Sequence, residues 1–281
     1  MTSTLAPAGA TAPSITDPLT QRSHTIWSAG AYDRISAGFR EEAEAFVARL
    51  ALGAGDDVLD AACGSGNLTI PAARTGATVT GLDLVSDLLA LTEAWAAREQ
   101  LSIHLDEGNA ESLPYGARTF DAVLSMFGVM FAARPELVAE ELQRVTRIGG
   151  RVALANWTRG GFIGQMLALH GKFVPPPAGV PSPILWGDTD VLSERFPADA
   201  WSVTTTPRVL TFRFAHTAAG VAELFRGSYG PTVRTFAALG EDQRAEFAAA
   251  LTSHWERHAR VTPAGVEVDS EYVEVIATRL A

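Results

Sequence analysis

The segment that most constrains the fold of this chain runs Val58-Leu59-Asp60-Ala61-Ala62-Cys63-Gly64-Ser65-Gly66-Asn67. An apolar pair ends in a carboxylate, and a turn of small residues then leads into Leu68-Thr69-Ile70. This pattern predicts a buried parallel strand, a glycine loop and a helix N-terminus. Gly64 and Gly66 lack a Cβ, so the backbone can turn sharply and a ligand can lie against it. Asp60 would stand at the carboxyl end of the strand, where open α/β sheets bind ligands, so a nucleotide-like cofactor is the first hypothesis.

Strand and helix patterns alternate along the first half of the chain. The expected strands are listed by residue number: 57–61, 78–82, 102–105, 122–126 and 151–157. Helical patterns separate them, with Ser86 as the expected cap of one helix, which predicts a doubly wound, parallel α/β sheet. The second half differs, and its expected elements are a helix over 162–173, a proline-rich connection over 174–183, a strand over 208–214, helices over 217–239 and 241–260, and a closing strand over 272–278.

Composition and charge exclude several classes of protein. The chain of 281 residues has a net charge of −10, which argues against a protein that wraps a phosphate backbone, so we expect no nucleic-acid partner. The single cysteine excludes an internal disulfide and a multi-cysteine metal site, and it favours a cytoplasmic protein. No apolar run approaches ~20 residues, so we expect no membrane span. Residues 1–23 are expected to be a flexible tail, without the basic start and apolar core of a secretory signal in residues 1–20.

Two further segments fit the same cofactor hypothesis. Asp83 follows the second expected strand, and a carboxylate there can accept hydrogen bonds from both hydroxyls of a ribose. Asn109 follows the third strand, and its amide can read the N6 and N1 edge of an adenine. A nicotinamide dinucleotide is the main competitor, but the third glycine of its fingerprint would fall on Thr69. A phosphate-binding P-loop is excluded because no Gly-Lys-Ser or Gly-Lys-Thr occurs.

These motifs, in this order, resemble the class I S-adenosylmethionine-dependent methyltransferases over roughly residues 24–157. The sequences of these motifs are most similar to those of the small-molecule branch that includes the ubiquinone/menaquinone methyltransferases. The segments that carry the resemblance are Val58 to Gly66, Gly81-Leu82-Asp83, Gly108-Asn109-Ala110-Glu111-Ser112-Leu113-Pro114, Phe120-Asp121-Ala122-Val123, and Arg144-Val145 through Gly149-Gly150-Arg151. The chain departs from the family at Ala62, where glycine is frequent, and at Asn109, where aspartate is usual.

The resemblance implies which residues hold S-adenosylmethionine and release S-adenosylhomocysteine. Asp60 and the loop amides would hold the methionine portion, Asp83 the ribose, and Asn109 with Ala110 the adenine. Phe127 would flank the cofactor, and Tyr32 would close over it from an N-terminal lid. The full predicted set is Tyr32, Asp60, Ala62, Gly64, Gly66, Asp83, Leu84, Asn109, Ala110, Glu111 and Phe127.

The acceptor site is expected in residues 158–270, which are rich in apolar and aromatic side chains. His170 is the candidate general base, and Tyr229, where Gly230 and Pro231 interrupt a helix, is the candidate acceptor-site residue. His104 is expected in the core. We expect no metal site, because the pair His254 and His258 has no third ligand nearby.

The sequence therefore predicts an α/β, doubly wound, Rossmann-like methyltransferase sheet, mostly parallel with an antiparallel last strand. Residues 24–157 would form the lid and cofactor-binding core, 158–270 an acceptor-binding helical cap, and 271–281 the closing strand. The predicted reaction is in-line methyl transfer to an oxygen, nitrogen or carbon of a small, hydrophobic or aromatic molecule in biosynthesis. An Asn-Pro-Pro-Tyr type motif, used by methyltransferases of nucleic-acid amino groups, is absent after the fourth strand. An NAD-dependent oxidoreductase and a non-catalytic cofactor-binding protein stay open as alternatives, and the sequence does not indicate an oligomeric state.

Overall fold

The computed structural model describes residues 17–281 of the chain. Of the predicted flexible tail, residues 1–16 lie outside the described residues, whereas Pro18–Trp27 forms helix α1. Asp17 caps this helix by accepting hydrogen bonds from the Leu19 and Thr20 amides, and Pro18 occupies its first turn. Within the described residues, α1 therefore begins ahead of the boundary predicted at residue 23.

A single sheet organises the part of the chain that the structure describes. Its strand order is β3-β2-β1-β4-β5-β8-β6, and β7 pairs with β8 outside this path. The first five strands are mutually parallel, and β8 runs antiparallel to both of its neighbours β5 and β6. The strands are β1 (Asp57–Ala61), β2 (Thr78–Asp83), β3 (His104–Glu107), β4 (Phe120–Met126), β5 (Thr146–Trp157), β6 (Trp201–Phe214), β7 (Arg260–Thr262) and β8 (Gly265–Arg279). This topology confirms the predicted fold class.

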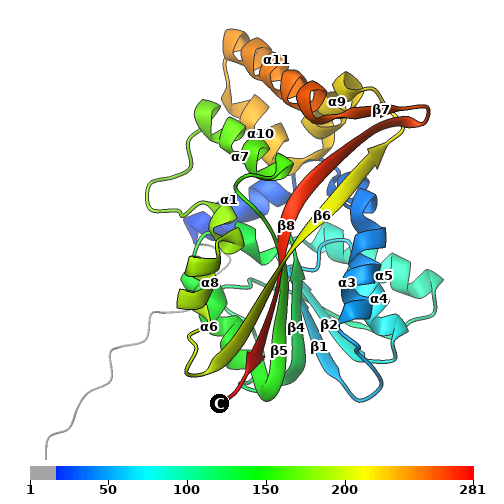
Figure 1. The fold of residues 1–281 in the computed structure, drawn as a ribbon, viewed down its shortest axis with the longest axis vertical. Helices are drawn as coiled ribbons and strands as arrows, with labels where there is room; N and C mark the ends of the chain where they lie inside the picture. Colours follow the sequence, from blue (N-terminus) through cyan, green and yellow to red (C-terminus); the bar gives the residue numbers. More distant parts are fainter. Residues whose placement is uncertain (1–16) are drawn as a thin grey trace, which may run out of the picture.

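Helices cover both faces of the parallel strands, which explains why those strands are almost continuously apolar. In Figure 1, α3 (Arg40–Arg49), α4 (Thr69–Arg74) and α5 (Ser86–Arg98) lie on one side of the sheet. Helices α6 (Pro135–Val145) and α8 (Thr189–Arg195) lie on the other side. The short elements α2 (Tyr32–Ser36), η1 (Ala37–Phe39), η2 (Val129–Phe131) and η3 (Pro183–Gly187) fill the connections.

The remaining helices gather around the upper half of the long antiparallel pair of strands β6 and β8 (Figure 1). These are α7 (Phe162–Phe173), α9 (Ala218–Ser228), α10 (Gly230–Ala238) and α11 (Glu241–His258), which we call the cap. Strands β6 and β8 pair from Trp201 with Arg279 to Phe214 with Val266, whereas β5 meets only residues 272–278 of β8. The pair of strands β6 and β8 therefore extends beyond the parallel sheet, and the cap lies at its projecting end.

Several predicted elements differ from the structure. Residues 217–239 form two helices, because the chain turns at Tyr229 before Gly230 and Pro231 start α10. The third strand lies at His104–Glu107 rather than 102–105, and the His104 side chain is exposed, so its assignment to the core is wrong. This strand is at the edge of the sheet, where one row of side chains faces solvent. Helix α5 is preceded by Val85, and no side chain caps it, so the predicted cap by Ser86 is also wrong.

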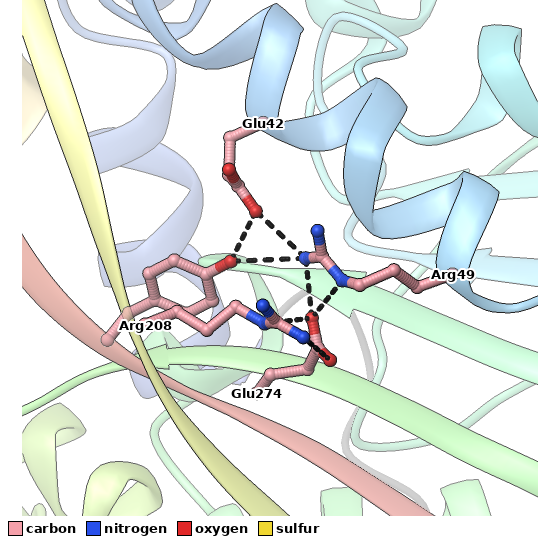
Figure 2. A network of polar contacts seen from close by, with 5 residues as sticks. Glu42, Arg49, Arg208 and Glu274 are labelled. Carbon is pink, nitrogen blue, oxygen red and sulfur yellow. Dashed lines mark hydrogen bonds and ion pairs between the residues drawn. The ribbon is translucent and has the colours of Figure 1, made fainter.

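A polar network connects α3 to the paired strands β6 and β8 (Figure 2). The carboxylate of Glu274 on β8 accepts hydrogen bonds from Arg49 Nη2 at 2.5 Å and from Arg208 Nε at 3.0 Å. Arg49 also lies 2.8 Å from Glu42 Oε1, and the buried Tyr272 hydroxyl donates to the same Glu42 oxygen at 2.6 Å. Two helix residues thus meet three strand residues that are more than 150 positions away in the chain.

Candidate functional site

The loop after β1 has the backbone that its glycines predicted. Gly64 and Gly66 have φ of +56° and +91°, and Ala62 has φ of +57°. A Cβ on Gly66 would stand 2.9 Å from Thr92 Cγ2 of α5, so the loop can lie against this helix only with glycine there. The Thr92 hydroxyl donates to the Gly64 carbonyl at 2.8 Å, which fixes the loop from the same side.

A cleft opens at the carboxyl ends of β1 to β4, with about 900 Å³ of space that is partly open to solvent. It lies where parallel sheets bind cofactors. Nine of the predicted cofactor residues line it: Tyr32, Ala62, Gly64, Asp83, Leu84, Asn109, Ala110, Glu111 and Phe127. Asp60 and Gly66 are not among its lining residues.

Asp83 lines the cleft from the end of β2. The Gly64 N–H donates to its Oδ2 at 2.8 Å, and the Val85 N–H donates to its Oδ1 at 2.9 Å. Burial raises the pKa of this carboxyl, against the lowering effect of these backbone hydrogen bonds. Each oxygen keeps a lone pair, so Asp83 can still accept two hydrogen bonds from a ligand diol.

Asp60 lies beneath the glycine loop and is buried. The Thr69 hydroxyl donates to its Oδ2 at 2.6 Å, so Asp60 fixes the start of α4 rather than the wall of the cleft. Burial raises its pKa to about 7, and the charge of Asp83 acts in the same direction. Two buried carboxylates under one cleft create a negative field that favours a cationic ligand.

Asn109 connects the cleft to helix α1. Its Oδ1 accepts from the Glu111 N–H at 3.0 Å, and its Nδ2 donates to Thr20 Oγ1 at 3.1 Å. Glu111 in turn pairs with Arg134, whose Nη1 lies 2.7 Å from Glu111 Oε2 and whose Nη2 lies 2.6 Å from Asp17 Oδ1. One donor and one acceptor position of the Asn109 amide stay available for a ligand.

The predicted set does not include three neighbouring polar residues of the cleft lining, Ser36, Ser65 and Asn67. Asn67 donates from Nδ2 to the Ser36 carbonyl at 2.8 Å, but its buried Oδ1 has no hydrogen-bond partner among the described residues. Ser36 and Ser65 share a hydrogen bond at 2.9 Å beside it. A buried amide oxygen without a partner is unfavourable, so this atom is suited to accept from a ligand. The only signal in the sequence was the position of Asn67 directly after Gly66.

Aromatic side chains close the cleft from two sides. Phe127 has φ of +55° and stacks on Trp157 with ring centroids 3.6 Å apart. A left-handed aromatic residue is strained, and strain of this kind concentrates at functional sites. From the N-terminal side, Trp27 packs edge-to-face on Tyr32 at 5.3 Å and on Phe131 at 4.9 Å. Trp27 and Phe131 were not among the predicted cofactor residues; Trp27 reaches the cleft from α1, and Phe131 reaches it from η2 after β4.

The structure places His170 and Tyr229 close to each other but outside the lining of this cleft. Their ring centroids are 6.4 Å apart. His170 is buried, with Nδ1 2.6 Å from the Met166 carbonyl and Nε2 2.8 Å from Thr232 Oγ1, and burial lowers its pKa to about 4. Tyr229 packs on Trp27 at 6.0 Å and Tyr32 at 6.4 Å, so it backs the aromatic wall.

A second, wider cavity lies beside the first, with about 2060 Å³ of space that is partly open to solvent. It is bounded by α1, η2, α7, the proline-rich connection and α10, and His170 lines it. Four residues line both cavities: Ser23, Trp27, Phe131 and Ala132. Helix α1 therefore separates the two spaces.

Two classes of feature are not found within residues 17–281. No helix there has the length and the apolar run that a bilayer span needs. The same residues contain no group of three or more His, Cys, Asp or Glu side chains arranged to hold a metal ion.

Known proteins resemble this chain in sequence and in fold. A family model described as a methyltransferase domain matches residues 59–154. The uncharacterized protein Rv1405c from Mycobacterium tuberculosis is 39% identical over 197 residues, which cover 70% of this chain and 72% of that protein. The ubiquinone/menaquinone biosynthesis C-methyltransferase UbiE from Agrobacterium fabrum is 37% identical over 106 residues, covering 36% and 41%. The crystal structure of the YcgJ protein from Bacillus subtilis shares the fold, with a TM-score of 0.57 at 13% identity over 84% of this chain and 97% of that one.

Proposed function

Because this chain belongs to the family of S-adenosylmethionine-dependent methyltransferases, we propose that it transfers a methyl group from S-adenosylmethionine to an oxygen, nitrogen or carbon of a small organic molecule. The observation that carries this proposal is the cleft in which Gly64, Asp83 and Asn109 face one space from three successive strand ends. In this proposal the enzyme is cytoplasmic, in keeping with its single, unpaired cysteine.

The chemistry of the cleft supports an adenosyl sulfonium ligand. Asp83 would accept from the ribose hydroxyls, and the loop of Asn109 and Ala110 would hold the adenine. The unpaired Asn67 Oδ1 would accept from the ammonium group of the methionine portion. A positive ligand would also offset the repulsion between the buried carboxylates Asp60 and Asp83.

Bound S-adenosylmethionine would supply an electrophilic methyl carbon, so the chain's own task is alignment and exclusion of water. The aromatic wall of Trp27, Tyr32 and Phe131 covers the cleft and supports this role. The acceptor would enter from the second cavity, which meets the first at Trp27 and Phe131. His170 and Tyr229 remain candidates for positioning the acceptor or its proton from this side.

A calorimetric titration tests the proposed cofactor. The protein should bind S-adenosylhomocysteine, and Asp83→Ala should weaken this binding by about 100-fold through the loss of hydrogen bonds to a carboxylate. Asp87→Ala, which removes the same charge from an exposed position on α5, should bind like the parent. Unchanged affinity in Asp83→Ala, with the fold intact by circular dichroism, would refute the ribose assignment.

Two further measurements separate the alternatives. An NAD-dependent oxidoreductase on the same sheet would bind NADH in preference to S-adenosylhomocysteine. A non-catalytic binder would take S-adenosylhomocysteine but transfer no labelled methyl group to any member of a metabolite panel. Methyl transfer in that panel would establish the proposed activity.

A further inference from the structure

The second cavity has a charge distribution that differs from the rest of the molecule. Three arginines line it from three separate segments: Arg22 of α1, Arg159 of the loop after β5, and Arg234 of α10. No aspartate or glutamate is among its lining residues, although the chain holds 32 acidic and 22 basic side chains. Electrostatic complementarity therefore points to an anion.

These arginines also lack internal partners within residues 17–281. No ion pair and no side-chain hydrogen bond joins Arg22, Arg159 or Arg234 to another described residue, whereas ten other arginines form ion pairs. All three are exposed, so their guanidinium groups are hydrated rather than buried without a partner. They are thus available to pair with a ligand that brings its own negative charge.

The rest of the lining is mainly apolar. Prolines of the connection after α7, together with Leu167 and Ile184, form much of one wall. His170 adds no charge near neutral pH, because burial lowers its pKa to about 4. An occupant that fits both kinds of lining has an apolar body and an anionic group.

We propose that the second cavity binds the methyl acceptor and selects one that carries a carboxylate or a phosphate on an apolar body. This inference rests on the proposed methyltransferase function, since it is the shared wall of Trp27 and Phe131 that brings such an acceptor up to the cofactor cleft. The three arginines fix the anionic end, and the reacting atom points toward that wall.

Matched naphthalene probes test the charge preference directly. The protein, saturated with S-adenosylhomocysteine to fill the first cleft, is titrated with 1-anilinonaphthalene-8-sulfonate and with its uncharged counterpart N-phenyl-1-naphthylamine. 1-Naphthoate, 1-naphthyl phosphate and 1-naphthamide then compete with the sulfonate probe. We expect the two anions to displace the probe and the amide to displace it poorly, and the stronger anion identifies which group the site prefers.

Arginine variants locate the effect. Arg22→Ala, Arg159→Ala and Arg234→Ala should each weaken binding of the sulfonate probe by roughly 2- to 5-fold, the usual range for a single exposed ion pair. The triple variant should bind both probes equally, and added salt should weaken only the sulfonate probe in the parent protein. Arg98→Ala is the matched control, since Arg98 is an exposed arginine of α5 that lines neither cavity.

The outcomes distinguish this inference from the proposed function. If 1-naphthamide competes as well as 1-naphthoate, or if Arg98→Ala weakens the sulfonate probe as much as the cavity variants do, the anion site is refuted even though S-adenosylhomocysteine binds. If S-adenosylhomocysteine does not bind, the proposed function fails. The probe titrations repeated without it still report whether the arginines bind an anion.

Discussion

Asp60 does not line the cleft, but its carboxyl is close enough to Asp83 for their charges to interact, so its ionisation should also be coupled to the charge of a ligand there. It is buried beneath the glycine loop, and burial raises its pKa to about 7. Below that pH the carboxyl is largely neutral, and above it the carboxylate is present. S-Adenosylmethionine carries a sulfonium charge that S-adenosylhomocysteine lacks, so ionisation of Asp60 should favour the first ligand over the second.

We therefore expect the preference for S-adenosylmethionine over S-adenosylhomocysteine to increase from pH 6 to pH 8. The change should be roughly 3- to 10-fold, on the order of 1 kcal/mol for charges that interact at an effective dielectric constant near 20. Calorimetry with both ligands at each pH measures the ratio, and the shared amino and carboxyl groups cancel in it. In Asp60→Asn the ratio should stay flat, and an equal slope in that variant would assign the effect to another group.

At the scale of elements, helix α1 is held over the cofactor cleft by a small number of polar contacts. Arg134 links Asp17, the cap of α1, to the buried Glu111, and Thr20 accepts from Asn109. The same helix separates the two cavities. Its detachment would open the cleft to solvent and join the two spaces, so α1 is suited to be the moving part of the site.

Arg134→Gln should loosen α1 without unfolding the sheet. We expect faster amide hydrogen exchange over residues 18–27 and a roughly 5- to 10-fold weaker affinity for S-adenosylhomocysteine, because two ion pairs to this arginine are lost. Arg147→Gln is the control, since Arg147 also pairs with two carboxylates, Asp57 and Asp121, near the opposite ends of β1 and β4. If both variants change the amide hydrogen exchange of α1 equally, the effect reflects a change in global stability and not the loss of local contacts that hold α1.

Elements fixed by local pattern were predicted well, and those fixed by tertiary contact were not. β1 and α7 have the predicted bounds, because an apolar run or a helical stripe between turn residues determines each of them. β6 begins at Trp201 rather than at 208, and β8 at Gly265 rather than at 272, since each strand extends by pairing with the other. That pairing is not visible in either segment alone.

The residues of the candidate site fall into the same two groups, those that a local pattern predicts and those that only tertiary contact brings together. The strand-end residues Asp83 and Asn109 could be predicted because parallel strands bring their carboxyl ends to one edge of the sheet. Thr20 and Trp27 could not, because they approach the cleft from a segment that the sequence assigned to a tail or an aromatic lead-in. The arginines of the second cavity are likewise scattered over more than 200 positions, and only the folded chain brings them to one cavity.

At the scale of the whole molecule, the network of Figure 2 holds strands β6 and β8, which carry the cap, against helix α3 of the N-terminal half. Glu274 is its centre, with a side chain that is 8% exposed and paired with both Arg49 and Arg208. Tyr272, two residues earlier, packs edge-to-face on Phe127 at 5.5 Å, so the network also supports the floor of the cofactor cleft. Loss of its central carboxylate would leave the Arg208 guanidinium without an ion-pair partner among the described residues and would leave Arg49 paired with Glu42 alone.

Glu274→Ala should therefore reduce the free energy of unfolding by roughly 2–3 kcal/mol, somewhat less than for a fully buried pair because both arginines keep partial contact with water. Urea unfolding followed by circular dichroism measures the change. Glu267→Ala is the matched control on the same strand: Glu267 also lies near two arginines, at 3.3 Å and 3.4 Å, but its side chain is 31% exposed. That variant should lose no more than about 1 kcal/mol. Equal losses in the two variants would mean that burial of the central carboxylate does not set the strength of the network.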